Sequence, residues 1–182
     1  MILNINLQTN QSIGKGVLET PSNKGDAGYD LRSVSPPMIN GDLWSGGLYK
    51  NIKYIEYDTN ISIAPEVDEL NEYNFFAMLF PRSSISNYNL SLCNSVGVID
   101  SGYRDSIKVR FNYISQPENL YIIKDGDESS CVLLGVDQSR IYQKGDKIAQ
   151  LYFAKHLHPK VFIKKSLDNS ERNLGGFGST GK

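Results

Sequence analysis

The sequence predicts an all-β domain of the sandwich, jelly-roll or small-barrel class. Short runs rich in Tyr, Val, Ile, Thr and Phe alternate with clusters of Gly, Pro, Asn and Asp, a pattern typical of strands joined by turns. Only one short segment has helical spacing. A chain of 182 residues that is 40% hydrophobic has the size and the apolar content of a single domain with its own core.

The clearest predicted strand covers residues 107–114, where apolar and polar side chains alternate. A second strand at residues 147–154 would place Ile148, Gln150 and Tyr152 on one face, and Ala149, Leu151 and Phe153 on the other. Further strands are predicted at residues 2–7, 52–57, 74–80, 121–124, 131–136 and 161–164.

The predicted helix begins at Ser83, which can act as its N-cap, and continues through Ile85 and Tyr88 at helical spacing. We expect one domain over residues 1–170, with surface insertions near residues 33–50 and 115–142. Residues 171–182 are rich in Gly and form a predicted flexible arm.

Composition disfavours several classes of function. A net charge of −1, spread along the chain, disfavours binding to long nucleic acid, which needs a basic face. No apolar run reaches the length of a membrane span, and no basic leader is present, so an intracellular (cytoplasmic or nuclear) location is expected. Cys93 and Cys131 form no CxxC motif and are expected to be idle thiols, and His156 and His158 lack a third metal ligand nearby.

The segment GVIDSGYR at residues 97–104 joins two predicted strands as a hairpin. A carboxylate at Asp100 could orient and deprotonate a water, and the ring of Tyr103 could pack against a flat ligand. Taken alone, the segment is more typical of an ordinary turn, in which Asp100 and Gly102 are turn residues.

Three other segments offer polar groups, each with a structural alternative. PRSS at residues 81–84 could present hydroxyl and N–H groups to an anion, or could simply cap a helix. Asp30 in AGYDL could be a solvated carboxylate, and Gln150 in GDKIAQ could be an exposed edge residue. The tail GGFGSTGK is not a P-loop, because its Ser and Thr precede the Gly-Lys pair and no helix follows.

Taken together, AGYDL, PRSS, GVIDSGYR, GDKIAQL and RNLGGFGSTG resemble, in this order, the five motifs of the trimeric dUTP pyrophosphatase (dUTPase) family. The resemblance runs from about Gly25 to the end, apart from the two insertions. It implies a distorted jelly-roll (β-clip) barrel and a homotrimer with shared active sites. It also implies Mg²⁺-assisted hydrolysis of dUTP to dUMP and pyrophosphate, which limits uracil in DNA and supplies dUMP for dTMP synthesis.

The resemblance assigns a role to each matching residue. Asp100 would activate the water, and such proton transfer typically accelerates a reaction ~10²–10⁴-fold. Tyr103 would pack under the deoxyribose and exclude a 2′-hydroxyl. Residues that would read the uracil edge are Asn94, Gly97, Val98, Ile99 and Lys108. Residues that would contact phosphates are Arg82, Ser83, Ser84, Gln150, Arg172, Gly178, Ser179 and Thr180, and Gln150 could instead position the water. Phe177 would stack on the uracil. Asp30 would reach Mg²⁺ through water, because the phosphates hold most of the metal's coordination.

Two positions depart from the family pattern. Asp105 and Asn173 stand where glycine is usual, and both residue types tolerate a positive φ better than most. The related dCTP deaminases share the fold, but the hairpin tyrosine and the complete tail favour a dUTPase. A protein-binding role of the 115–142 insertion is a further expectation.

Overall fold

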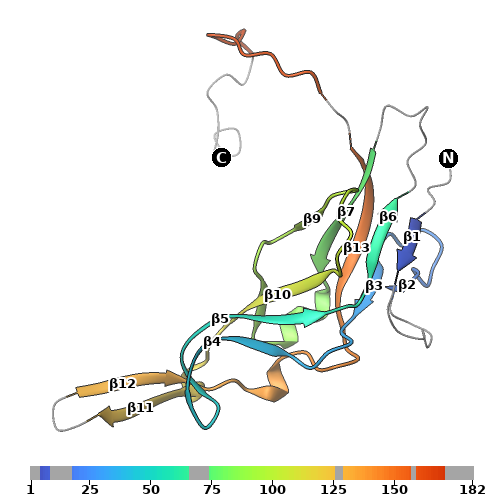
Figure 1. Cartoon of the computed structure of the whole chain (residues 1–182). Helices are drawn as coiled ribbons and strands as arrows, with labels where there is room; N and C mark the ends of the chain where they lie inside the picture. The colour runs from blue at the N-terminus through green and yellow to red at the C-terminus, as the bar shows by residue number, and fades with distance from the viewer. Residues whose placement is uncertain (1–4, 9–17, 66–73, 126–128, 157–158, 171–182) are drawn as a thin grey trace, which may run out of the picture.

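The strands form three antiparallel sheets in the described part of the chain, residues 5–8, 18–65, 74–125, 129–156 and 159–170 of a computed structural model (Figure 1). The strands are β1 (Ile5–Gln8), β2 (Leu18–Glu19), β3 (Tyr29–Arg32), β4 (Met38–Ser45), β5 (Leu48–Asp58), β6 (Ser62–Pro65), β7 (Asn74–Pro81), β8 (Leu90–Leu92), β9 (Gly97–Ile99), β10 (Lys108–Tyr113), β11 (Leu120–Asp125), β12 (Ser129–Leu134) and β13 (Lys147–His156). Three 3₁₀ helices accompany them: η1 (Ser83–Asn87), η2 (Pro117–Asn119) and η3 (Gln138–Arg140).

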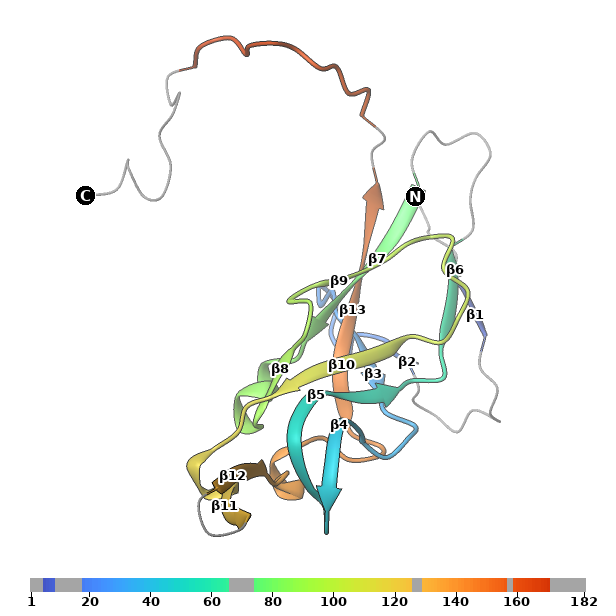
Figure 2. The same cartoon turned by 60° about the vertical axis from the view of Figure 1, so that its left-hand side comes forward.

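The two larger sheets carry the candidate site. One has the order β2-β3-β13-β7-β9, and the other has the order β11-β12-β5-β10-β8 with β4 also paired to β5. Strands β1 and β6 make a separate pair. The turned view shows the β11–β12 hairpin at the end of the molecule opposite β6 and the C-terminal end of β13 (Figure 2).

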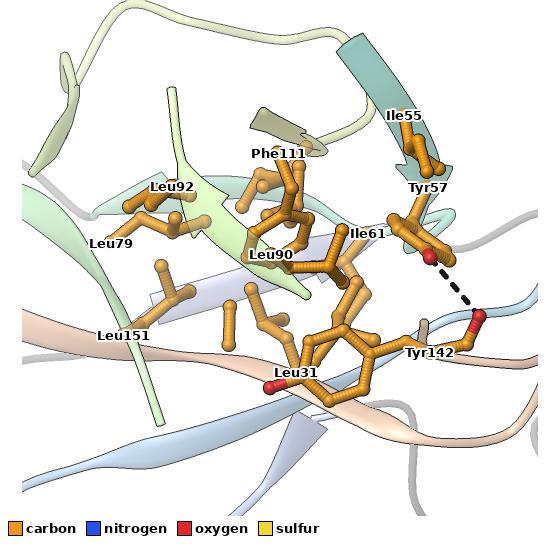
Figure 3. Close-up of a cluster of buried hydrophobic side chains, with 14 of the residues drawn as sticks. Leu31, Ile55, Tyr57, Ile61, Leu79, Leu90, Leu92, Phe111, Tyr142 and Leu151 are labelled. Carbon is orange, nitrogen blue, oxygen red and sulfur yellow. Dashed lines mark hydrogen bonds between the residues drawn. The ribbon is translucent and has the colours of Figure 1, made fainter. Parts of the chain in front are cut away.

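The hydrophobic core contains side chains from both larger sheets (Figure 3). Strand β10 follows its predicted alternation, since Val109 and Phe111 are buried while Lys108 and Arg110 are exposed. Strand β13 departs from the prediction at Ile148, which is fully buried although Gln150 and Tyr152 are not. A β-bulge between Lys147 and Ala149 causes this difference, because the extra residue turns Ile148 toward the core.

Two other predictions are wrong. Residues 161–164 form no strand, and Val161, Phe162 and Ile163 are largely exposed; apolar composition alone does not make a strand without a partner to complete its ladder. The N-cap of η1 is Arg82, and it makes no side-chain capping bond. No helix within the described residues is long and apolar enough to cross a membrane.

Both predicted insertions contain hairpins. Residues 33–50 include the β4–β5 turn, where Gly46 (φ 58°) and Gly47 (φ 81°) suit a turn that needs two positive φ angles. Residues 115–142 include the β11–β12 hairpin. Its two legs are joined at the base by Tyr113, whose hydroxyl donates to Asn119 Oδ1 (3.1 Å) and accepts from the N–H of Asp137 (3.0 Å).

Candidate active site

A cavity of about 420 Å³ lies between β9, the following turn and the start of β10. It is lined by seven of the residues predicted to form the site: Asn94, Gly97, Val98, Ile99, Asp100, Tyr103 and Lys108. The predicted hairpin is wrong, because β9 pairs with β7 in one sheet and β10 pairs with β5 and β8 in another; residues 100–107 connect the two sheets across the opening. The structure brings these seven residues together within one chain, whereas Phe177, predicted to stack on the uracil, lies outside the described residues.

Asp100 follows directly on β9 and is exposed at the cavity. Its carbonyl oxygen accepts from the N–H of Tyr103 (3.0 Å), which fixes the turn. Within the described residues its carboxylate makes no hydrogen bond or ion pair, so both oxygens are available to a water. Tyr103 is 42% exposed, and its hydroxyl donates to the carbonyl of Ser106 (3.2 Å), which restrains the ring in its place on the cavity lining.

Gly97 is needed for the close approach of two neighbours. A Cβ at this position would lie 3.2 Å from Asn94 Nδ2 and 3.3 Å from Leu79 Cβ, tighter than ordinary van der Waals contact. Leu79 on β7 is the register partner of Gly97. The glycine thus lets Asn94 lie against the cavity while β9 pairs with β7.

Asp105 does not adopt the left-handed conformation that its replacement of glycine suggested. The described non-glycine residues with positive φ are Asn60 (51°) and Ser95 (56°). Instead the Asp105 carboxylate accepts from the N–H of Ser106 at 2.7 Å. This substitution is accommodated by a local side-chain bond.

Two polar residues of the cavity were missed from sequence, Cys93 and Arg110. The Cys93 thiol donates to Asn112 Oδ1 (3.3 Å), and burial raises its pKa while Arg110 opposes the rise. Arg110 pairs with Glu56 at 2.6 Å and stands 4.4 Å from the ring centre of Tyr54. Arg110 could have been found, because it shares a strand face with Lys108.

Three residues matched to the phosphate motifs, Asp30, Arg82 and Gln150, lie outside this cavity, on β3, directly after β7 and on β13. Gln150 on β13 is the register partner of both Asp30 on β3 and Phe80 on β7. The Arg82 Nε is 2.8 Å from Asp30 Oδ1, and Lys147 Nζ is 3.0 Å from Asp30 Oδ2. Asp30 is therefore paired with two cations, which leaves it little capacity as a direct metal ligand.

Further charges extend this network. Glu19 accepts from Lys147 (2.5 Å) and from Arg32 (2.8 Å). The hydrogen bond from Lys147 and, to a smaller extent, the one from Arg32 hold the pKa of the Glu19 carboxyl below its usual range. In turn, Glu19 and, to a smaller extent, Asp30 raise the pKa of Lys147. The network fixes the side chains that surround Arg82.

Gln150 is half-buried on a central strand, so it is not an exposed edge residue. Its Nε2 lies at a long 3.5 Å from the carbonyl of Pro81. A Cβ on Gly28 would come within 2.5 Å of Gln150 Oε1, so the glycine leaves room for this amide. Gly28 and Gln150 line a second hollow of about 330 Å³ with Met78, Phe80 and Tyr152.

The remaining predicted residues fall into two groups. Ser83 is exposed at the start of η1, and the hydroxyl of Ser84 is buried. Arg172, Phe177, Gly178, Ser179 and Thr180, with the rest of the predicted arm, lie outside the described residues, as does His158. No cluster of three or more His, Cys, Asp or Glu side chains suited to a metal occurs in the part of the chain that the structure describes.

Comparison with known proteins places the chain in a family. A family model described as dUTPase matches residues 130–181. The chain is 32% identical over 160 residues to the deoxyuridine 5′-triphosphate nucleotidohydrolase of Thermoanaerobacter sp. (strain X514), covering 87% of this chain and 84% of the relative. The chain belongs to the dUTPase family. A Clostridium acetobutylicum dUTPase is 29% identical over 178 residues, 97% of each chain.

Solved dUTPases share the fold. A structure of the dUTPase of Staphylococcus bacteriophage 80alpha with dUpNHpp aligns with a TM-score of 0.66 at 21% identity, over 98% of this chain and 99% of that one. A mutant dUTPase from phage phi11 of S. aureus, with a structural Mg(II) ion, aligns with a TM-score of 0.56 at 17% identity, over 90% and 97% of the two chains. These alignments confirm the predicted jelly-roll fold of the dUTPases.

Proposed function

We propose that this dUTPase family member hydrolyses dUTP to dUMP and pyrophosphate with Asp100 as the base. The observation that carries the proposal is the cavity at the β9–β10 connection, which joins a carboxylate with no partner among the described residues, a restrained tyrosine and an edge of backbone and amide groups. The relatives at 32% and 29% identity are named for the same reaction.

In this mechanism the cavity holds the deoxyuridine. Backbone groups of β9 and the Asn94 amide read the uracil edge, and the narrow cavity excludes a methyl group on the base. The ring of Tyr103 packs under the sugar and rejects a 2′-hydroxyl. Asp100 orients a water and accepts its proton, while Arg82 and the N–H groups at the start of η1 neutralise phosphate charge.

Magnesium fits the phosphate side of the site, as a metal held mostly by phosphates and water. Mg²⁺ keeps several waters and needs few protein ligands, which agrees with the matched carboxylate, Asp30, being already paired with Arg82 and Lys147. When bound, the ion would supply charge neutralisation to the leaving pyrophosphate. Asp30 would then contact a metal-bound water.

The homotrimer with shared sites is part of the proposal. Its support is that Arg82 and Gln150 do not line the cavity that contains Asp100, so a second chain would bring the two halves together. Exposed apolar side chains on the outer face of the same sheet, Val98 (63%) and Tyr152 (42%), offer a contact surface. Light scattering should give three times the chain mass, and a monomer would contradict this.

A protein partner for the 115–142 insertion is a second proposal. Leu120, Ile122 and Val132 lie exposed on one face of the β11–β12 hairpin, and β11 is an edge strand that could accept a further strand. Proteins recovered with the wild-type chain and lost with Ile122→Asp would support the proposal. Identical recovery would oppose it.

The test of the reaction is pyrophosphate release with Mg²⁺ from dUTP, UTP, dTTP and dCTP in parallel. Release from dUTP alone is the expected result. Ammonia release from dCTP would instead indicate the related deaminase, and release from none would overturn the proposed function.

A further inference from the structure

Ser106, near the end of the connection between β9 and β10, uses all three of its polar groups in hydrogen bonds. Its N–H donates to Asp105 Oδ1 (2.7 Å), its carbonyl accepts from the Tyr103 hydroxyl (3.2 Å), and its own hydroxyl donates to Asp58 Oδ1 (2.5 Å). The first two partners are local, whereas Asp58 is the last residue of β5. Ser106 therefore links the ring of Tyr103 to a distant strand.

Asp58 is itself held by several bonds. Its N–H donates to Ser35 Oγ (3.1 Å), and its carbonyl accepts from the N–H of Val34 (2.9 Å). It is the register partner of Lys108 on β10. Its Oδ1 also accepts from the N–H of Asn60 (2.7 Å), a residue with a positive φ of 51°, as is typical of an Asx-turn. The carboxylate that Ser106 meets is thus a fixed point.

The turn at residues 58–61 also holds the residue after Ser106. The N–H of Ile107 donates to the carbonyl of Ile61 (2.8 Å), and the buried Thr59 hydroxyl donates to the carbonyl of Ile107 (2.7 Å). Residues 102–105, in contrast, are exposed. Within the described residues the Tyr103 hydroxyl makes one hydrogen bond, to the Ser106 carbonyl, so the polar restraint on its ring comes from this anchored end of the connection.

We propose that Asp58 and Ser106 are positioning residues that set the choice between deoxyribose and ribose. The inference rests on the proposed function, in which the Tyr103 ring lies under the sugar and rejects a 2′-hydroxyl. A ring rejects a hydroxyl group only while it keeps its place. The bond from Ser106 to a carboxylate is of the strong, charge-assisted kind, and it holds the residue to which the ring is tethered. Neither Asp58 nor Ser106 lines the cavity, so both act through Tyr103.

Ser106→Ala tests this assignment, because it removes the hydroxyl that meets Asp58 and keeps the carbonyl that meets Tyr103. We measure thermal unfolding and the affinities, with Mg²⁺, for dUpNHpp and for UpNHpp, its ribose counterpart. The preference for dUpNHpp over UpNHpp should fall about 5-fold, the scale of one hydrogen bond. In an Asp58→Ala background the same substitution should leave the preference unchanged, because the partner of the hydroxyl is already absent.

Tyr57→Phe is the matched control, since it removes a different hydrogen bond of β5, the one to the Tyr142 carbonyl at 3.0 Å. This control should lower the Tm and leave the preference for dUpNHpp unchanged. An unchanged preference in Ser106→Ala, the same fall in Tyr57→Phe, or an undiminished fall in the Asp58→Ala background would overturn the inference alone. A wild-type chain that binds neither nucleotide, or binds both equally, would overturn the proposed function and this inference with it.

Discussion

The cavity at the β9–β10 connection and the charged surface around Asp30 hold the two halves of the predicted site within the described residues, and they are built in opposite ways. The cavity comes from one stretch, residues 92–110 with Leu79, and leaves the Asp100 carboxylate unpaired among the described residues. The charged surface joins β2, β3, β13 and the residue after β7, and its carboxylates are already paired with Arg82, Lys147 and Arg32. In the proposed mechanism a local connection between strands presents the base, whereas long-range strand pairing holds the cations that would meet the phosphates.

The largest expected effect comes from removing the reactive group of the cavity. Asp100→Asn keeps the size of the side chain but cannot take a proton, so kcat should fall roughly 10²–10⁴-fold with little change in dUTP binding. Asp105→Asn is the control, because its carboxylate bonds only within the turn. Near-normal turnover in Asp100→Asn would remove Asp100 from its role.

The next largest effect is expected in the charged surface around Asp30. Arg82→Ala should weaken dUTP binding roughly 10- to 100-fold, the scale of hydrogen bonds to charged groups, and should leave dUMP binding nearly unchanged. Asp30 keeps Lys147 as a partner, so folding should survive. Arg32→Ala, which breaks the pair with Glu19, is the control. An equal loss of dUTP binding in both variants would mean that the ion-pair network as a whole, and not Arg82 itself, supports binding.

A smaller effect is expected from the glycines of β9 and of the connection that follows it. Gly97→Ala places a methyl group against Asn94 and Leu79, and such overpacking typically destabilises by about 1–3 kcal/mol. We expect a lower Tm and a several-fold higher KM for dUTP. At Gly102 the added methyl group meets nothing within 4 Å, so Gly102→Ala should change neither value. Similar behaviour of the two variants would contradict the close approach at Gly97.

The smallest effect lies in the core, at alkaline pH. Burial raises the pKa of Tyr57, so the unfolded chain ionises this group first, near pH 10, and stability contributed by the neutral phenol is lost as pH rises further. Tyr57→Phe should lower stability at pH 8 by about 1 kcal/mol but flatten its decline above pH 10. Urea unfolding at several pH values measures the stability of both proteins. Parallel declines of wild type and Tyr57→Phe above pH 10 would exclude ionisation of Tyr57 as the cause.

The sequence predicted the strand alternation of β10 and, through the family resemblance, the seven residues that line the cavity. The alternation is local and could be read from the pattern, whereas the predicted hairpin was wrong, because which strand β9 and β10 each pair with depends on distant segments. The ion pair between Asp30 and Arg82 and the bulge that buries Ile148 depend on which strands pair, and no local pattern encodes that. Residues 161–164 failed as a strand for the same reason.

The most direct test of the account mixes the two impaired variants, Asp100→Asn and Arg82→Ala, at a dUTP concentration too low to saturate Arg82→Ala. If one chain supplies the base and a second chain supplies the phosphate residues, mixed oligomers contain some sites with both groups intact. Co-refolded variants should then release pyrophosphate from dUTP well above the sum of the two separate activities. Activity that never exceeds that sum would contradict a site assembled from different chains.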